Sequence, residues 1–436
     1  MKKYFVLCLI TMLYGCELGS VDVECDNCDI WGAYPMATID DGVVQLTWMK
    51  PMQEQKYDPN RKDIVDPDKF DIYISENEKS NFRKLIEADR DNLYHEESEP
   101  YQYGYYRYTV DKLRNGKPYF FYVVSKKNGF ENRTSETIMA VPNIRKGFEI
   151  LMSDRSSSFY DVAVARQKNK IAYVNHYNTW DGGENCCMAT ALIVSNMNGS
   201  GKELVTYSSY KPSWSPSNDK IAFHFDGIIN VGWFPAQIAV YDCETQSITQ
   251  LTDGAEYSYA PNFSENGELI IFQSTKNTPD NDKEDVQLQP SNIWVINLKT
   301  LESFQVTDIF KASLRTARRP CWIDNDRFIF QGLSSKKYQI YESSVSKKQI
   351  NKVFDSKWND YNPVISPDKK KIAFISNRSS TNQAWIYHIE SKTYTQITPY
   401  SIYEDVEPTW NKIDWLDNST IIFSISGHQL VKQRID

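Results

Sequence analysis

The side chains best suited to metal or nucleophilic chemistry are few in this chain, and their spacing matches no known catalytic pattern. No HxH, HExxH or GxSxG segment occurs. A metal site needs three or four converging ligands, so we expect neither a metal nor a cofactor. The five histidines are spread along the chain, at His95, His176, His224, His388 and His428.

Acidic side chains on predicted loops are the remaining candidates for catalysis. Glycoside hydrolysis uses two carboxyl groups that flank the scissile bond. Five carboxylates could converge in this way, namely Asp161, Asp181, Glu184, Asp226 and Glu407. They define an alternative function, a carbohydrate-active enzyme of the glycoside hydrolase or lyase class. Our leading interpretation is that the protein is not an enzyme.

These candidates lie on a repeated pattern. Five segments carry a proline at their third position, with the prolines 43 to 59 residues apart: 210–214, 259–263, 318–322, 361–365 and 406–410. A short apolar strand with an aromatic fourth residue recurs six times, at 170–173, 220–223, 269–272, 327–330, 371–374 and 420–423. A period of this size indicates an array of small units that bury their apolar faces against one another.

Together with the Gln-x-Thr segments at 250–252, 305–307 and 396–398, this pattern resembles the TolB-like propeller repeat. The resemblance implies an all-β ring of six four-stranded blades over residues 143–436. Residues 160–164 are the first copy, without the proline. We expect segment 147–153 to pair with the chain end at 427–436 and close the ring. In that family the propeller works through envelope protein contacts.

Aligning the repeats places their first two residues around the mouth of the central channel. Tyrosine rings there suit a sugar or a peptide; the alternative, that they fill the channel and bond to backbone, stays open. The charged members are mixed in sign. The predicted binding residues are Tyr160, Asp161, Tyr210, Lys211, Tyr259, Arg318, Arg319, Tyr361 and Glu407, with Trp180, Trp233 and Trp358 on long loops.

The first residues predict export. Residues 1–15 combine two lysines with an apolar run too short to span a bilayer, which is typical of a signal peptide. The run ends in Leu-Tyr-Gly-Cys, which resembles a bacterial lipobox and implies a lipid on Cys16; secretion with cleavage nearby is the alternative. Residues 16–28 are polar and acidic and predict a tether. We therefore expect an exported protein anchored by its lipid to the cell envelope, at the outer membrane and facing the periplasm or the surface.

Residues 29–142 alternate between apolar and polar positions, which predicts short strands. Trp48 on an early strand and the Leu113–turn–Tyr119 corner resemble a fibronectin type III domain. The resemblance implies a β-sandwich in which the Tyr119 hydroxyl closes a turn.

The cysteines fit an exported protein, in which disulfides can form. The adjacent pair Cys186 and Cys187 could form a strained disulfide, pair elsewhere or stay free. Cys25 and Cys28, in the tether, could form a local disulfide or remain thiols.

The net charge of −8 argues against a nucleic acid partner, because phosphate binding needs a basic field. We expect a monomer that acts as a binding scaffold, with an envelope protein or a glycan as partner.

Overall fold

The computed structural model describes a largely β-stranded chain. The described residues are 36–49, 67–77, 80–98, 103–135, 137–142, 148–153, 158–179, 187–225, 235–253, 256–278, 289–398, 412–425 and 429–435. The predicted signal peptide, Cys16 and the tether lie outside them. Within these ranges, no helix is long and apolar enough to cross a membrane.

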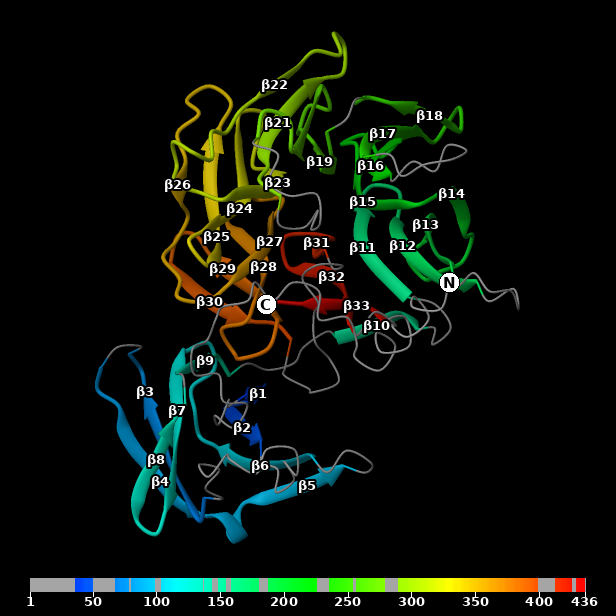
Figure 1. Cartoon of the computed structure of the whole chain (residues 1–436). Coiled ribbons are helices and arrows are strands. Elements are labelled where there is room, and N and C mark those ends of the chain that lie inside the picture. The colour runs from blue at the N-terminus through cyan, green and yellow to red at the C-terminus, as the bar shows by residue number, and fades with distance from the viewer. Residues whose placement is uncertain are drawn as a thin grey trace, which may run out of the picture.

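Two sheets make up the N-terminal unit (Figure 1). One has the order β1-β2-β6-β5, with β1 Met36–Asp40, β2 Val43–Met49, β6 Tyr103–Val110 and β5 Tyr94–Ser98. The other has the order β4-β3-β7-β8, with β9 on β7; the strands are β4 Arg83–Asp89, β3 Lys69–Ser75, β7 Tyr119–Lys127, β8 Phe130–Thr134 and β9 Ile138–Ala140. A single turn of 3-10 helix, η1 Arg90–Asn92, follows β4.

The core of this unit forms around Trp48, as its position on an early strand predicts. The Trp48 ring packs edge-on against Phe70 with 5.3 Å between centroids, and both are buried. The backbone N–H of Arg114 donates to the Tyr119 hydroxyl at 3.0 Å, so Tyr119 closes the turn that precedes its strand.

The rest of the described chain forms six four-stranded sheets, the blades of a propeller (Figure 1). Blade 1 contains β11 Ser158–Ala165, β12 Lys170–Thr179, β13 Cys187–Asn196 and β14 Glu203–Tyr207. Blade 2 contains β15 Ser209–Trp214, β16 Lys220–Phe225, β17 Gln237–Asp242 and β18 Ser247–Gln250. Blade 3 contains β19 Ser258–Phe263, β20 Leu269–Ser274, β21 Asn292–Asn297 and β22 Ser303–Gln305.

Blades 4 to 6 complete the ring. Blade 4 contains β23 Thr316–Trp322, β24 Arg327–Ser334, β25 Lys337–Ser344 and β26 Asn351–Lys352. Blade 5 contains β27 Asp360–Ile365, β28 Lys371–Ser376, β29 Gln383–His388 and β30 Thr393–Gln396. Blade 6 contains β31 Asp414–Trp415, β32 Thr420–Ile425, β33 Gln429–Arg434 and, as its outer strand, β10 Phe148–Ser153.

The innermost strands β11, β15, β19, β23, β27 and β31 contact one another in sequence around the channel, and β31 contacts β11 again. The closing sheet joins the two ends of the propeller segment, because β10 pairs antiparallel with β33. The expected pairing of these two segments is confirmed.

The second strand of every blade carries the recurring aromatic residue at its buried centre. Each of these residues is at most 2% exposed. In five blades its neighbours along the strand are mainly β-branched residues or alanine, which suit a buried strand. The six are Tyr173, Phe223, Phe272, Phe330, Phe374 and Phe423.

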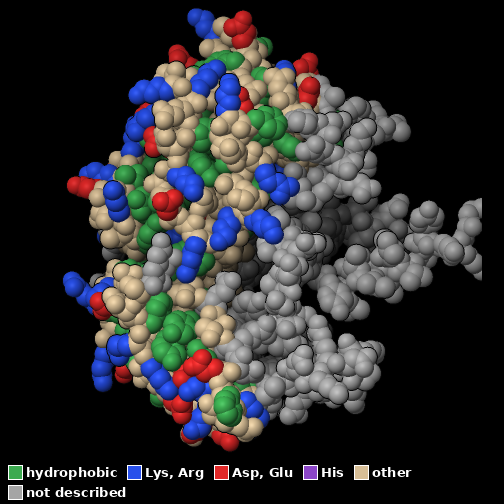
Figure 2. All heavy atoms as spheres, turned by 60° about the vertical axis from the view of Figure 1, so that its left-hand side comes forward, with side chains coloured by type: hydrophobic (Ala, Val, Ile, Leu, Met, Phe, Trp, Pro, Cys, Tyr) green, Lys and Arg blue, Asp and Glu red, His purple; other side chains and the backbone are tan. Residues whose placement is uncertain are grey.

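The N-terminal unit packs on blade 5. Phe120, Met139 and Val141 belong to the same buried cluster as the blade 5 core. The Met139 N–H also donates to the Arg378 carbonyl at 2.9 Å. On the side seen in Figure 2, apolar side chains form small patches between Lys, Arg, Asp and Glu side chains.

Candidate functional site

A local irregularity in the innermost strands turns one side chain toward the channel in five of the blades. In five blades the antiparallel register breaks after the first motif residue. The next residue then has a positive φ of 50° to 54°, a region that non-glycine residues rarely adopt. These five residues are Asp161, Lys211, Ala260, Arg319 and Asn362.

Hydrogen bonds between blades hold this strained backbone. The N–H of Ala260 donates to His224 Nδ1 at 3.5 Å, and the N–H of Arg319 donates to Gln273 Oε1 at 3.0 Å. The N–H of Asn362 donates to Gln331 in the same way, at 2.9 Å. Each acceptor is the residue after the recurring aromatic in the preceding blade, so a polar side chain in a buried strand stabilises its neighbour's bulge.

Blade 1 uses a different acceptor, because Val174 occupies that position in its second strand. There the Asp161 carboxylate accepts the Lys211 N–H at 3.4 Å and forms an ion pair with Lys211 Nζ at 2.5 Å. The Asp161 side chain is fully buried.

The sixth member of the ring is Lys412, which corrects the sequence prediction. In blades 2 and 4 the motif tryptophan donates its indole N–H to a carbonyl of the preceding blade, Trp214 to Ala163 and Trp322 to Asn262, each at 3.1 Å. In blade 6 the residue that does this is Trp415, which donates to Val364 at 3.0 Å and pairs with Ile421.

The sixth copy of the motif is therefore 411–415, and assigning it to 406–410 was wrong by five residues. Its second position is Lys412 instead of Glu407. Glu407 itself lies outside the described residues. The error arose because 406–410 contains the expected proline and tryptophan, whereas isoleucine replaces the proline at position 413.

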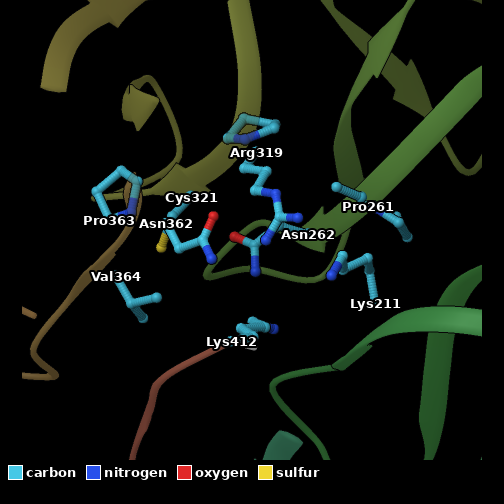
Figure 3. Close-up of a pocket in the computed structure, with 11 residues that line it drawn as sticks. Lys211, Pro261, Asn262, Arg319, Cys321, Asn362, Pro363, Val364 and Lys412 are labelled. Carbon is cyan, nitrogen blue, oxygen red and sulfur yellow. The ribbon is translucent and has the colours of Figure 1, made fainter. Parts of the chain in front are cut away.

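These side chains line a small cavity that is partly open to solvent. Figure 3 shows Lys211, Arg319, Asn362 and Lys412 converging on it from four different blades. Lys412 Nζ donates to the Pro212 carbonyl at 2.9 Å, across the channel from blade 6 to blade 2. Asn262, Cys321 and Val364 contribute further to the wall.

The electrostatics of the cavity follow from burial and from crowding of like charges. Burial, together with the Arg319 and Lys412 cations, lowers the pKa of Lys211 to about 7, although Asp161 opposes the shift. Burial also lowers the pKa of His224 well below its ordinary value, and Lys211 and Arg319 add to that effect. His224 is therefore a neutral ring, which agrees with Nδ1 accepting a hydrogen bond.

The predicted tyrosines lie beside this ring. Tyr210 stacks on the His224 imidazole at 5.3 Å, and Tyr259 meets it edge-on at 5.1 Å. Tyr361 packs against Tyr338 with 5.3 Å between centroids, and Tyr160 is half-buried. These contacts favour the alternative in which tyrosines help to build the channel wall.

The remaining predicted residues have varied surroundings. Arg318 Nη2 donates to the Gln289 carbonyl at 3.0 Å. Trp358 is half-buried and lies 5.5 Å from the Arg378 guanidinium, so it is part of the blade 5 packing. Trp180, Asp181, Glu184, Cys186, Asp226 and Trp233 lie outside the described residues, and the side chain of Cys187 is not described.

Sequence reasoning missed Lys412 and the role of the inter-blade acceptors. A signal for the acceptors was present, since a polar residue follows the buried aromatic in three repeats, at His224, Gln273 and Gln331. Across the described part of the chain, no three His, Cys, Asp or Glu side chains gather as a metal site.

Comparisons with known proteins agree with this geometry. TolB from Francisella tularensis subsp. mediasiatica (strain FSC147), a Tol-Pal system protein, is 26% identical over 215 residues, which cover 48% of this chain and 45% of the relative. The chain thus matches less than half the length of that relative.

Two solved structures share a distant likeness. TolB from Acinetobacter baumannii has 17% identity and a TM-score of 0.42, over 74% of this chain and 77% of the other. An oligogalacturonate lyase in complex with manganese has 10% identity and a TM-score of 0.42, over 66% of this chain and 96% of the other.

The profile of the TolB beta propeller domain (PD40) matches residues 164–429, which is more than half of the chain. With six blades and their repeated innermost motif, this chain belongs to the TolB beta propeller family.

Proposed function

We propose that this protein is a non-catalytic binding scaffold of the bacterial cell envelope, and that it recognises a protein partner at the channel mouth of its propeller. One observation carries the proposal. Five blades repeat the same bulge, but the side chain that each bulge turns toward the channel differs, from Asp161 through Ala260 to Arg319. A repeated scaffold with a varied rim is typical of a recognition surface.

The family relationship supports a protein as the partner. The curated relative is named as a component of the Tol-Pal system, which is an assembly of proteins. The alternative of a carbohydrate-active enzyme depended on acidic side chains, and among those described Asp161 is already bound to Lys211 in a buried ion pair. The other four carboxylates of that alternative lie outside the described residues.

The N-terminal segment completes the proposal. A lipid on Cys16 would hold the protein at the outer membrane, and residues 16–28 would serve as the tether. The unit with strands β1 to β9 would act as a fibronectin type III-like spacer or docking module.

Site-specific photo-crosslinking in the native cells tests the proposal. In each blade, two loops lie on the mouth face: the loop that precedes the innermost strand and the loop between the second and third strands. They share this face because alternate turns of an antiparallel meander lie at the same end. A benzophenone amino acid at Phe310 or Ser335, both exposed on such loops, should give one discrete protein adduct. Thr245 and Lys299, exposed on turns of the opposite face, are the matched controls.

Equal adducts from both faces, or none from the mouth face, would contradict binding at this surface. Turnover of an envelope polysaccharide by the purified protein would contradict the non-catalytic part.

A further inference from the structure

Among the described residues, positive charge exceeds negative charge at one level of the channel. Three of the six ring positions are cationic, namely Lys211, Arg319 and Lys412, and one, Asp161, is anionic. The cations come from blades 2, 4 and 6, and all three line the same cavity (Figure 3). The chain as a whole carries a net charge of −8, so this is a local reversal of sign.

One of the three cations is already paired with a carboxylate. Asp161 Oδ1 lies 2.5 Å from Lys211 Nζ, with the acidic side chain fully buried. This single carboxylate leaves two positive charges in excess among the four charged ring positions. Cations gathered in a partly desolvated cavity repel one another more strongly than they would in water. An anion that enters the cavity would relieve this repulsion.

We propose that this level of the channel is an anion-binding site, at which Lys211, Arg319 and Lys412 hold the carboxylate groups of a ligand that enters from the mouth. Arginine presents a planar fork of donors that matches a carboxylate, and lysine acts as a point charge. The carboxylates can come from a small polycarboxylate or from an acidic segment of a protein. The site rests on the channel alone and does not depend on the partner proposed above.

Binding at this site is coupled to a proton. Among the described residues, the titratable groups that face Lys211 are Asp161, Arg319, Lys412 and the neutral His224. Because the Lys211 amine loses its proton at about pH 7 in the empty channel, a bound carboxylate must favour the protonated form. The affinity should therefore fall as the pH rises from 6 to 9, and calorimetry should detect proton uptake on binding.

The test is equilibrium binding to the purified full-length protein at low ionic strength, with citrate and a hexaglutamate peptide as separate probes. Saturable binding of either probe is expected, and Arg319→Gln or Lys412→Gln should weaken it at least about tenfold, since each removes a charged contact. Lys299→Gln makes the same change of charge on an exposed turn and should leave the affinity unchanged.

The two probes distinguish the source of the carboxylate. Binding of citrate indicates a free small anion, and binding of the peptide alone indicates an acidic protein segment. If neither probe saturates, or if the channel variants bind as well as Lys299→Gln, the proposal is wrong.

A second variant keeps the test independent of folding defects. Ala260 occupies the same bulge as the charged residues, and four neighbours with longer side chains adopt the same positive φ. Ala260→Glu should therefore fold and place a carboxylate in the ring. It should abolish binding of both probes and raise the midpoint of thermal unfolding at low salt, whereas Ala260→Gln should do neither.

Discussion

Lys211 is a buried amine between one carboxylate and two cations, and its pKa of about 7 makes folding depend on pH. In the unfolded chain the same amine keeps its proton up to its ordinary value of 10.5. Between these values the unfolded state binds more protons, so the free energy of unfolding rises with pH. Below about pH 7 both states are protonated, and the contribution no longer changes.

We therefore expect the wild-type protein to gain stability relative to Lys211→Met when the pH rises from 7 to 9.5. The gain should exceed about 1 kcal/mol, because one pKa unit corresponds to about 1.4 kcal/mol. Urea unfolding at the two pH values measures it. Lys299→Met removes an exposed amine, and its free energy of unfolding should change with pH as that of the wild type does. If the free energies of wild type and Lys211→Met changed equally with pH, Lys211 would not titrate in this range.

At the scale of elements, blade 5 depends on a buried cation. Arg378 is 1% exposed, and its Nη2 lies 2.6 Å from the Asp360 carboxylate. Its Nε donates to Ser376 at 2.9 Å. Five aromatic rings surround the guanidinium, with centroids 4.4 to 5.9 Å away: Phe354, Trp358, Phe374, Trp385 and Tyr394.

Arg378→Met should destabilise the protein by about 3–5 kcal/mol, because it leaves the Asp360 carboxylate buried without a counter-charge. The double variant Arg378→Met with Asp360→Asn should recover part of that loss, since no unpaired charge remains. Denaturant unfolding of the wild type and the two variants measures both effects. A double variant no more stable than the single one would show that the ion pair is not the source of the loss.

The blades also show how far a sequence can specify this fold. The recurring aromatic predicted the second strand of every blade, because a buried residue on a repeated strand leaves a local apolar pattern. The innermost strand of blade 6 was misplaced, since its proline is replaced by isoleucine. Spacing distinguishes the copies: Trp415 precedes Ile421 by six residues and Trp410 precedes it by eleven, against seven from Trp214 to Ile221.

The candidate site was less predictable than the blades. The repeat placed Lys211 and Arg319 at the channel, but the charge of the ring depended on the register of blade 6. The bonds from the bulges to His224, Gln273 and Gln331 join different blades. Such contacts are set by how neighbouring sheets pack, which a pattern along one strand does not record.

At the scale of the whole molecule, the ring is held closed by one strand. β33 lies between β32 and β10, so it joins the end of the chain to the segment that precedes blade 1. Its residues Leu430 and Val431 are fully buried. Without β33, β10 has no neighbour in its sheet, and β32 exposes an unpaired edge.

Deletion of residues 427–436 should therefore abolish the cooperative thermal unfolding of the propeller, as followed by circular dichroism and calorimetry. Val431→Asp should have a similar effect within the full-length chain, because it buries an unpaired charge between β10 and β32. Arg434→Gln changes an exposed side chain of the same strand and should unfold like the wild type. If the truncated chain kept a single transition at the wild-type temperature, closure by β33 would not be what holds the six blades together.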